Sequence, residues 1–469
     1  MKNGKNLLLF ILAAAQFMVI LDSSIVNVAL PSIMQGLHFA PDNLQWIVTA
    51  YILSFGGFLL LGGRAADLFG RRRIFMIGLI GFTLGSLAAG VAQNEVMMIT
   101  ARAIQGLTAA FMSPAALSII LTEFKEGKDR NKALGVWGAV GAGGAAAGLI
   151  IGGFLTEYLG WRWDFFVNLP IGVALIFLTL KYIPKHQSES DHKDLDLSGA
   201  ILVTAGLMSL VYGLTKAPEL GWISGSTVGW VGSALVLLVL FIVNEFRVKH
   251  PLIDLQIFRI RNLTGANITQ LIVTSSLLAM FFFVSLYIQN ILGYKPVQTG
   301  LSFLPFAVTV GITATQASKL IGKFGFKPLL VGGPLLLALG LFILSHISVG
   351  GSYFAVVFPA LIIMAIGGGL TFVSVSVAAT SGVPKHQAGL ASGLLNTSQQ
   401  IGGALGLAVL SGIAATAATS TIASGIQVAT VTGYHTALLV ASTFAVAASL
   451  VSFIVIRPVK IVANANKSA

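Results

Sequence analysis

The sequence contains no cysteine among its 469 residues, and it is poor in charge, with 9% charged residues against 56% hydrophobic ones. The absence of cysteine excludes disulfide bonds, thiol chemistry and cysteine metal sites. Soluble globular proteins carry about 25% charged residues, so a chain this apolar has too little polar surface to face water. Its length therefore suits a series of membrane spans of about 20 residues each better than several soluble domains.

Acidic residues are missing from the whole second part of the chain. All 16 aspartate and glutamate residues lie at or before Asp254, so a proton carried by a carboxylate must be carried in the first part. The sequence also lacks the phosphate-binding loop G-x-x-x-x-G-K-[ST] and the H-E-x-x-H and G-x-S-x-G motifs. We therefore expect neither an enzyme nor an ATP-driven pump, but a carrier that uses an ion gradient or the gradient of its substrate.

Long apolar stretches separated by polar breaks make up most of the chain. In lipid such stretches must be helices, because backbone groups have to be satisfied within the segment. The run from Leu7 to Leu30 is too long for the apolar core of a signal peptide, and we expect it to remain as the first span. The fourteen predicted helices cover residues 7–30, 44–63, 74–94, 96–122, 133–157, 164–183, 198–215, 227–246, 262–290, 299–318, 328–346, 352–379, 387–416 and 433–456.

Lysine and arginine concentrate on one side of these spans. With the N-terminus in the cytoplasm, only Arg162, Lys216 and Lys295 of the 28 basic residues fall in outer loops, and Arg102 lies inside a span. This bias follows the positive-inside rule and predicts a multi-pass protein of the cell membrane with both termini in the cytoplasm. It also accounts for the net charge of +12 without a nucleic-acid partner.

Two cytoplasmic loops echo each other. Residues 63–72 (GRAADLFGRR) follow the second span, and residues 318–327 (SKLIGKFGFK) follow the tenth with the same glycine spacing and basic residues. This predicts two six-helix halves, a plan that transporters use. The fold class we expect is an all-α integral membrane protein with a first half at 1–183, a cytoplasmic linker at 184–197, an inserted helix pair with its loop at 198–261 and a second half at 262–469.

A carboxylate and a guanidinium lie inside predicted spans. A charge in a span is costly, so Asp22 and Arg102 are expected to face a cavity or each other. At 1.5 Å per residue, Asp22 lies about 12 Å and Arg102 about 9 Å from the outer ends of their spans. The two can therefore share a level, and we predict that they are coupled directly or through water. Gln105 follows Arg102 by three residues and faces the same way. Asp22 would carry the coupling proton, although a static ion pair that fixes helix packing is the alternative.

Two further motifs contain closely spaced glycines. In the inner turn, Gly63, Asp67, Gly70, Arg71 and Arg72 suit a latch that holds the cytoplasmic side shut, or only a topology signal. In the fifth span the small-x-x-x-small pattern allows close helix approach, either for static packing or for a surface that slides or bends. The glycines of that pattern are Gly144, Gly148, Gly152 and Gly153.

A mixed set of polar and aromatic residues suits a substrate cavity for a lipophilic ligand. Its members are Asn27, Gln105, Asn267, Gln270, Phe281, Tyr287, Asn396 and Gln399. At the span ends we expect Glu157 and Asp164 to be solvated and His435 to lie at the interface. No metal site and no cofactor other than the proton is expected.

Together these motifs resemble the major facilitator superfamily, and within it the fourteen-span drug:proton antiporters of the QacA/EmrB-like family. The stretches that carry the resemblance are residues 21–31 (LDSSIVNVALP), 63–73 (GRAADLFGRRR), 102–110 (RAIQGLTAA) and 160–170 (GWRWDFFVNLP). Leu149 stands where the family's fifth-span motif has proline, and Thr108 where its fourth-span motif often has glycine.

The resemblance implies alternating access, in which Asp22 loads a proton in the outward-open state and releases it inward as a substrate binds. It implies a proton-coupled antiporter that exports lipophilic neutral or monocationic drugs. Because only one carboxylate is well placed, we expect about one proton per cycle. Relatives that export divalent cations carry acids in their second half, which this chain lacks. We expect a monomer in the bilayer. A periplasmic adaptor would suit a double-membraned cell, but no long outer loop indicates one.

Three other functions fit the same sequence. The first is a dedicated exporter of one metabolite, antibiotic, siderophore or lipid, which a substrate panel would separate from multidrug export. The second is a proton symporter that imports nutrients, which the direction of transport would reveal. The third is a membrane receptor or scaffold with a transporter fold, which would move nothing in liposomes.

Overall fold

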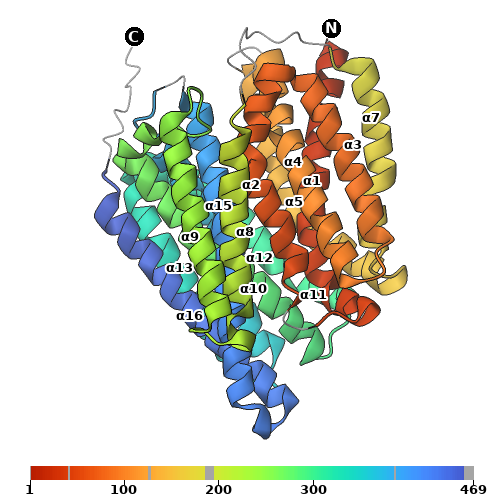
Figure 1. The fold of residues 1–469 in the computed structure, drawn as a ribbon, viewed down its shortest axis with the longest axis vertical. Coiled ribbons are helices and arrows are strands. Elements are labelled where there is room, and N and C mark those ends of the chain that lie inside the picture. The colour runs from red at the N-terminus through yellow and green to blue at the C-terminus, as the bar shows by residue number, and fades with distance from the viewer. Residues whose placement is uncertain (1, 41–42, 125–127, 185–194, 385–386, 459–469) are drawn as a thin grey trace.

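The computed structural model describes residues 2–40, 43–124, 128–184, 195–384 and 387–458. Within these ranges the chain is built of helices and contains no β-strand. The described residues include 14 segments long and apolar enough to cross a membrane, one for each predicted span. The protein is therefore a multi-pass membrane protein, as predicted (Figure 1).

The helices follow one another with short connections. Those of the first part are α1 (Lys2–Leu37), α2 (Trp46–Phe69), α3 (Arg71–Gly90), α4 (Glu95–Glu123), α5 (Lys128–Tyr158), α6 (Trp163–Phe166) and α7 (Asn168–Tyr182). An inserted pair follows, α8 (Leu197–Leu220) and α9 (Gly225–Arg247), and then a 3-10 turn, η2 (Leu255–Arg259). The last part contains α10 (Arg261–Asn290), α11 (Pro296–Ser302), α12 (Leu304–Phe324), α13 (Phe326–Leu344), a π turn η3 (Tyr353–Val357), α14 (Phe358–Thr380), α15 (Ala388–Ser420), a 3-10 turn η5 (Ile422–Ser424) and α16 (Ile426–Val455).

Two spans differ most from the prediction at their ends. Helix α1 continues through Pro31 to Leu37, and α16 begins at Ile426 instead of residue 433. In α16 the hydroxyls of Thr430 and Thr432 bond to backbone carbonyls one turn earlier, at 2.8 and 2.9 Å. Hydroxyls satisfied in this way fit inside an apolar helix, so the polar start of α16 was wrongly read as a loop.

The helices pack in two sets, one of α1–α7 and one of α10–α16. Figure 1 shows the first set in red to yellow beside the second in green to blue. The sets meet where α1 faces α10, α2 faces α15 and α5 faces α11. The exact domain boundaries stay a prediction.

Glycines bring α2 and α4 into backbone contact. A Cβ atom on Gly62 would lie 2.0 Å from the carbonyl oxygen of Ala110, and one on Gly106 would lie 2.1 Å from that of Tyr51. Only glycine allows this approach, which brings Arg102 of α4 close to the backbone of α2.

One seam between the sets is closed at one end and parted at the other. We call the side on which α1 begins the inner side. At the outer end of α5, a Cβ on Gly153 would lie 2.6 Å from the carbonyl oxygen of Pro296. Gly135 lies five turns closer to the inner side on the same face of α5, since an α-helix repeats every 18 residues. A Cβ on Gly135 would have no atom of another described element within 4 Å. On the facing helices Gly300 touches α5, whereas Gly311 of α12 has no such neighbour. The seam between α5 and α11–α12 therefore opens towards the inner side.

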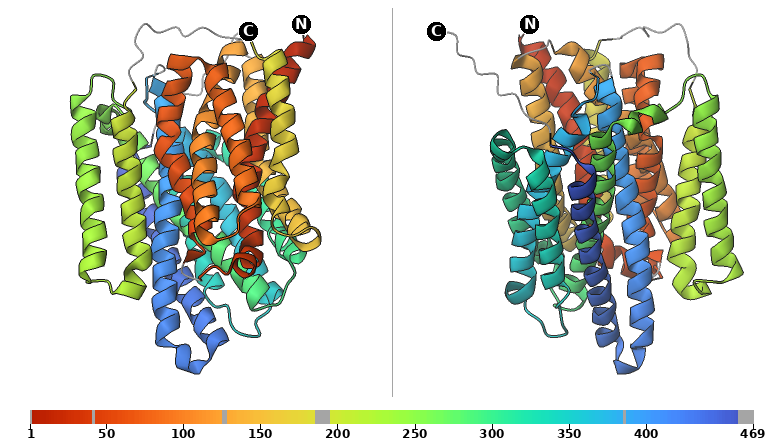
Figure 2. Two further views of the ribbon diagram at one scale, coloured as in Figure 1. Left: turned by 45° about the vertical axis from the view of Figure 1, so that its right-hand side comes forward. Right: turned by 90° about the vertical axis from the view of Figure 1, so that its left-hand side faces the viewer.

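The inserted pair stands at one edge of the molecule, as the yellow-green hairpin in Figure 2 shows. Asp196 caps α8 through the backbone N–H of Gly199 at 2.8 Å and accepts bonds from Asn244 of α9 at 2.8 and 2.9 Å. Burial raises the pKa of the Asp196 carboxyl, but the hydrogen bonds from Gly199, Asn244 and Ser198 outweigh it and hold this pKa below its usual value. The inner ends of the two helices are thereby fastened together.

Candidate functional site

Asp22 of α1 and Arg102 of α4 form a buried ion pair. The Nη1 atom of Arg102 lies 2.5 Å from Oδ2 of Asp22, and their side chains are 1% and 0% exposed. The contact expected from their depths in the two spans is therefore direct. Its part in moving protons stays a prediction.

Amide and hydroxyl groups surround the pair. Gln105 donates to the second carboxylate oxygen of Asp22 at 2.9 Å and accepts from Arg102 at 2.9 Å. Asn168 of α7 donates to the same oxygen of Asp22 at 2.8 Å, and Ser86 of α3 accepts from Gln105 at 2.8 Å. Both oxygens of the carboxylate thus have donors, which is what a buried charge requires.

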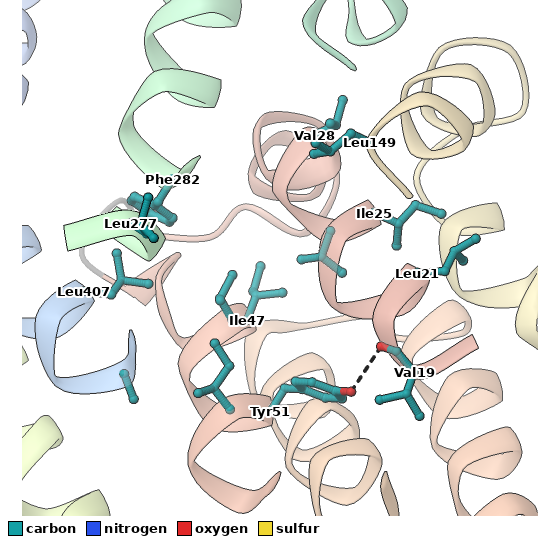
Figure 3. Close-up of a cluster of buried hydrophobic side chains, with 14 of the residues drawn as sticks. Val19, Leu21, Ile25, Val28, Ile47, Tyr51, Leu149, Leu277, Phe282 and Leu407 are labelled. Carbon is teal, nitrogen blue, oxygen red and sulfur yellow. Dashed lines mark hydrogen bonds between the residues drawn. The ribbon is translucent and has the colours of Figure 1, made fainter. Parts of the chain in front are cut away.

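Arg102 is held by further groups on α2. Its Nε donates to the carbonyl oxygen of Ile47 at 2.9 Å, and its guanidinium lies over the ring of Tyr51, 4.3 Å from the centroid. Figure 3 shows Tyr51 of α2 pointing to the carbonyl of Val19 on α1, and Leu21 among the apolar side chains of α1. These contacts fix the cation to α2 and α4 independently of Asp22, while Asp22 itself belongs to α1.

Three of the glycines singled out in α5 pack against α1 beside Asp22. A Cβ on Gly148 would lie 2.8 Å from Ser24, and one on Gly152 would lie 2.5 Å from Ile25. Gly144 faces Ile20 at 3.2 Å, whereas Gly153 faces α11. The small-residue pattern is therefore a contact surface between α5 and the helix that carries the buried acid.

Comparison with known proteins places this arrangement in a family. Residues 12–407 match the family model described as the Major Facilitator Superfamily. The chain belongs to the major facilitator superfamily. It is 39% identical to the puromycin resistance protein pur8 of Streptomyces alboniger, over 95% of this chain and 89% of that protein. It is 38% identical to the cephamycin export protein CmcT of Amycolatopsis lactamdurans, over 86% of this chain and 83% of that protein.

Solved structures show the same fold at lower identity. The oligopeptide-transporter family member PepTSo superimposes with a TM-score of 0.70 at 16% identity, over 96% of this chain and 97% of that one. A bacterial homologue of the lysosomal transporter Spinster, in an inward-facing form, superimposes with a TM-score of 0.68 at 17% identity, over 97% of both chains. These likenesses establish a major facilitator fold for the chain.

The inner-turn motif makes contacts within the first set of helices. Gly70 has φ 94° between α2 and α3, a conformation that favours glycine. Asp67 accepts from Arg71 and from Ser118 of α4, each at 3.4 Å, and Arg72 donates to the carbonyl oxygen of Leu180 at 2.8 Å. Each of these contacts joins the turn to its own half, and the role of the turn as a latch stays a prediction.

The residues predicted to line a substrate cavity lie in several different contacts, and the cavity itself stays a prediction. Gln105 belongs to the buried cluster around Asp22, and Asn27 bonds to the carbonyls of Ser23 and Ser24 within α1. Asn267 accepts from Ser398 near the inner side.

The others serve separate contacts. Gln270 bonds to Thr274, Phe281 packs on Phe303 at 5.4 Å between ring centroids, and Tyr287 donates to the carbonyl oxygen of Ser348. Asn396 is exposed on α15, and Gln399 is half-buried.

One expectation about the outer ends of spans is wrong, and two other residues there have partners in the structure. Asp164 is fully buried, not solvated, and accepts from Thr156 of α5 at 2.6 Å. Glu157 is half-buried and accepts from the backbone N–H of Val297 at 3.0 Å, across the seam between the two sets. His435 lies within α16 and not at its start, and it bonds to the carbonyl oxygen of Ser345 at the end of α13; its place at the membrane interface stays a prediction.

Sequence reasoning missed three groups of the cluster, Ser86, Asn168 and Tyr51. Each lies in its own apolar span, so no spacing relates it to Asp22. The one available signal was Asn168, an amide at the outer end of an apolar span.

Proposed function

We propose that this chain is a proton-coupled antiporter of the cytoplasmic membrane, with both termini in the cytoplasm, which exports lipophilic neutral or monocationic compounds. Export is supported by the relatives, which are named for antibiotic resistance or export. The observation that best supports proton coupling is the fully buried Asp22–Arg102 pair, because ionisable groups inside a membrane mark ion pathways.

The contacts of the pair explain how a proton would act on the fold. A proton on Asp22 removes the charge that attracts Arg102, while Arg102 keeps its bonds to Ile47 on α2 and Gln105 on α4. Helix α1 is then released from α4. It remains packed on the glycine face of α5, where small side chains allow one helix to slide past the other.

The conformation fits one stage of this cycle. The α5–α11 seam is closed at the outer side and parted towards the inner side, and the ion pair is intact. This is the form in which the proton has left and a compound enters from the cytoplasm or the inner leaflet. Return to the outward-open form carries the compound out, and a proton then reloads Asp22.

The charges available limit the compound. The helices from α10 onwards contain no acidic residue, so they cannot neutralise two positive charges in a buried site. This argues against divalent cations, and the proposal takes uncharged compounds and compounds with one positive charge. Dedicated export of a single such compound uses the same machinery and is the second candidate.

The experiment is transport by purified protein in proteoliposomes under an imposed pH gradient. The test compounds are ethidium, a fluorescent lipophilic cation, and puromycin, chosen from a relative's name. Asp22→Asn tests the buried acid, and Glu219→Gln is the matched control because the Glu219 side chain is 56% exposed and lies outside the proposed sites.

We expect gradient-dependent export by the wild type and by Glu219→Gln, and none by Asp22→Asn. Transport of one compound from a broad panel would identify a dedicated exporter. Movement of the compound together with protons would identify a symporter. No flux of any compound would contradict the transport function.

A further inference from the structure

A cavity lies at the outer half of the molecule, away from the buried ion pair. Its volume is about 450 Å³, and it is lined by Met34 of α1, by Leu44 and Gln45 just before α2, and by residues of α8, α10, α15 and α16. No member of the Asp22 cluster lines it, nor does any residue predicted for the substrate cavity. Figure 3 shows Phe282, one of the lining residues, beside Leu407 of α15.

The inserted helix α8 supplies one wall of this cavity. It lies against both sets: Thr204 fills the space above Gly57 of α2, and Leu214 packs over Gly412 of α15. Thr215 follows Leu214 and lines the cavity. The inserted pair therefore adds Thr215 to a cavity whose other lining residues come from α1, α10, α15, α16 and the residues before α2.

Two hydroxyl groups at the cavity lack a partner within the described structure. Thr215 is 4% exposed, and its Oγ1 has no hydrogen bond; the same is true of the buried Oγ of Ser411 on α15. On the same helix Thr204 bonds to the carbonyl of Ala200 at 2.7 Å, as threonines in helices usually do. Buried polar groups are nearly always bonded, so these two hydroxyls are unsatisfied groups beside the cavity that a ligand could bond.

The remaining lining residues define the chemistry of that molecule. Phe282, Phe283 and Tyr434 give the cavity aromatic walls, with the rings of Phe283 and Tyr434 at 5.4 Å between centroids. None of the described lining residues is an acid, a histidine, a lysine or an arginine. The volume lies in the range of sites for drug-sized ligands.

We propose that this cavity binds an uncharged, mostly apolar molecule whose polar group bonds to Thr215 and Ser411. Two sources share that chemistry: a transported compound held before its release outward, and a membrane lipid. The first source rests on the proposed function, whereas the binding itself requires no proton coupling.

The chain has no cysteine, so single cysteines report on the cavity directly. Thr215→Cys and Ser411→Cys are labelled with N-ethylmaleimide in lipid nanodiscs, with and without Nile red, a neutral apolar dye. Thr416→Cys is the control, because Thr416 is exposed on the same helix as Ser411 and does not line the cavity. Tetraphenylphosphonium serves as the charged comparison.

Nile red at ten times its dissociation constant should slow labelling of both cavity cysteines about tenfold and leave the control unchanged. Tetraphenylphosphonium should protect neither. Ala415→Phe, placed in the cavity wall, should abolish protection of Ser411→Cys while thermal unfolding shows that the variant folds.

Labelling in a second medium, lipid-free detergent, identifies the source of the ligand. If a lipid occupies the cavity, the cysteines are unreactive in nanodiscs and become reactive in lipid-free detergent, where Nile red then protects them. Cysteines that react in both media and are never protected by Nile red would overturn the proposal. Equal protection by tetraphenylphosphonium would overturn the neutral ligand class. None of these readouts uses a proton gradient, so failure of the proposed function leaves them unaffected.

Discussion

The Nη1 atom of Arg102 lies 2.5 Å from Oδ2 of Asp22, and neither side chain reaches the surface. Because Arg102 is also bonded to α2 and α4, the carboxylate of Asp22 is the part of the pair that can change its attachment. The charge of one residue on α1 thus decides how firmly α1 is attached to its neighbours.

Removing one member of this pair should destabilise the protein more than removing both. Arg102→Gln leaves the Asp22 charge buried without its cation, which costs about 3–5 kcal/mol. The double variant Asp22→Asn/Arg102→Gln leaves no unpaired charge, so the two effects should not add. The free energies of unfolding of the single and double variants in detergent test this non-additivity. A loss of stability in the double variant equal to the sum of the two single losses would contradict it.

Two glycines of α5 should respond oppositely to alanine. Gly148→Ala places a Cβ 2.8 Å from Ser24 and 2.9 Å from a backbone oxygen of α1, so both stability and export should fall. Gly143→Ala meets no atom within 4 Å and gains helix propensity of about 1 kcal/mol, so it should be tolerated. Thermal unfolding and transport are measured for both variants. Equal stability and equal export of the two variants would argue against a close contact between α1 and α5.

Two hydrogen bonds across the outer seam should bias the conformation. Ser285 donates to the carbonyl oxygen of Asn27 at 2.6 Å, and Gln289 donates to that of Val28 at 2.9 Å. Each bond contributes about 1 kcal/mol, so Ser285→Ala with Gln289→Ala should shift the equilibrium towards an outward-open form by more than tenfold. Double electron–electron resonance between spin labels on cysteines at residues 158 and 295 measures this.

The control for that experiment is Thr416→Ala, which removes a bond to Gly412 within α15 and none across the seam. In Thr416→Ala the distribution of distances between the two spin labels should match that of the wild type. An unchanged distribution in the Ser285→Ala/Gln289→Ala variant would show that these bonds do not hold the outer side closed.

Asp164 should tolerate conversion to an amide. It is fully buried, and within the described residues no cation lies within ion-pair distance of it, so its ionised form would be costly. Asp164→Asn keeps an acceptor for Thr156 and should change stability little, whereas Asp164→Leu leaves that hydroxyl unsatisfied and should cost about 1–3 kcal/mol. If unfolding shows a large loss for Asp164→Asn, the carboxylate is charged and has a partner.

The sequence predicted what depends on length and polarity along the chain. The fourteen spans and the shared level of Asp22 and Arg102 followed from hydropathy and the rise per residue. The burial of Asp164 did not, because a residue at the end of a span faces water or protein according to which helix covers it. Here α5 covers it through Thr156.

The predicted substrate residues show the same limit. Polar side chains in different spans, such as Asn27 and Asn396, have no spacing that tells whether they face one cavity. The outer cavity depends on Thr215 of the inserted pair, for which the sequence indicated no function. Contacts between helices distant in sequence decide these positions.

The most direct test of coupling through Asp22 follows protons and substrate together. Proteoliposomes that contain the pH dye pyranine receive a transported compound, and proton movement is recorded for the wild type and for Asp22→Asn, with compound exchange as the measure of folded protein. The account predicts proton movement driven by the compound in the wild type, and exchange without proton movement in Asp22→Asn. Proton movement at the wild-type rate in Asp22→Asn would contradict it and place the proton site elsewhere.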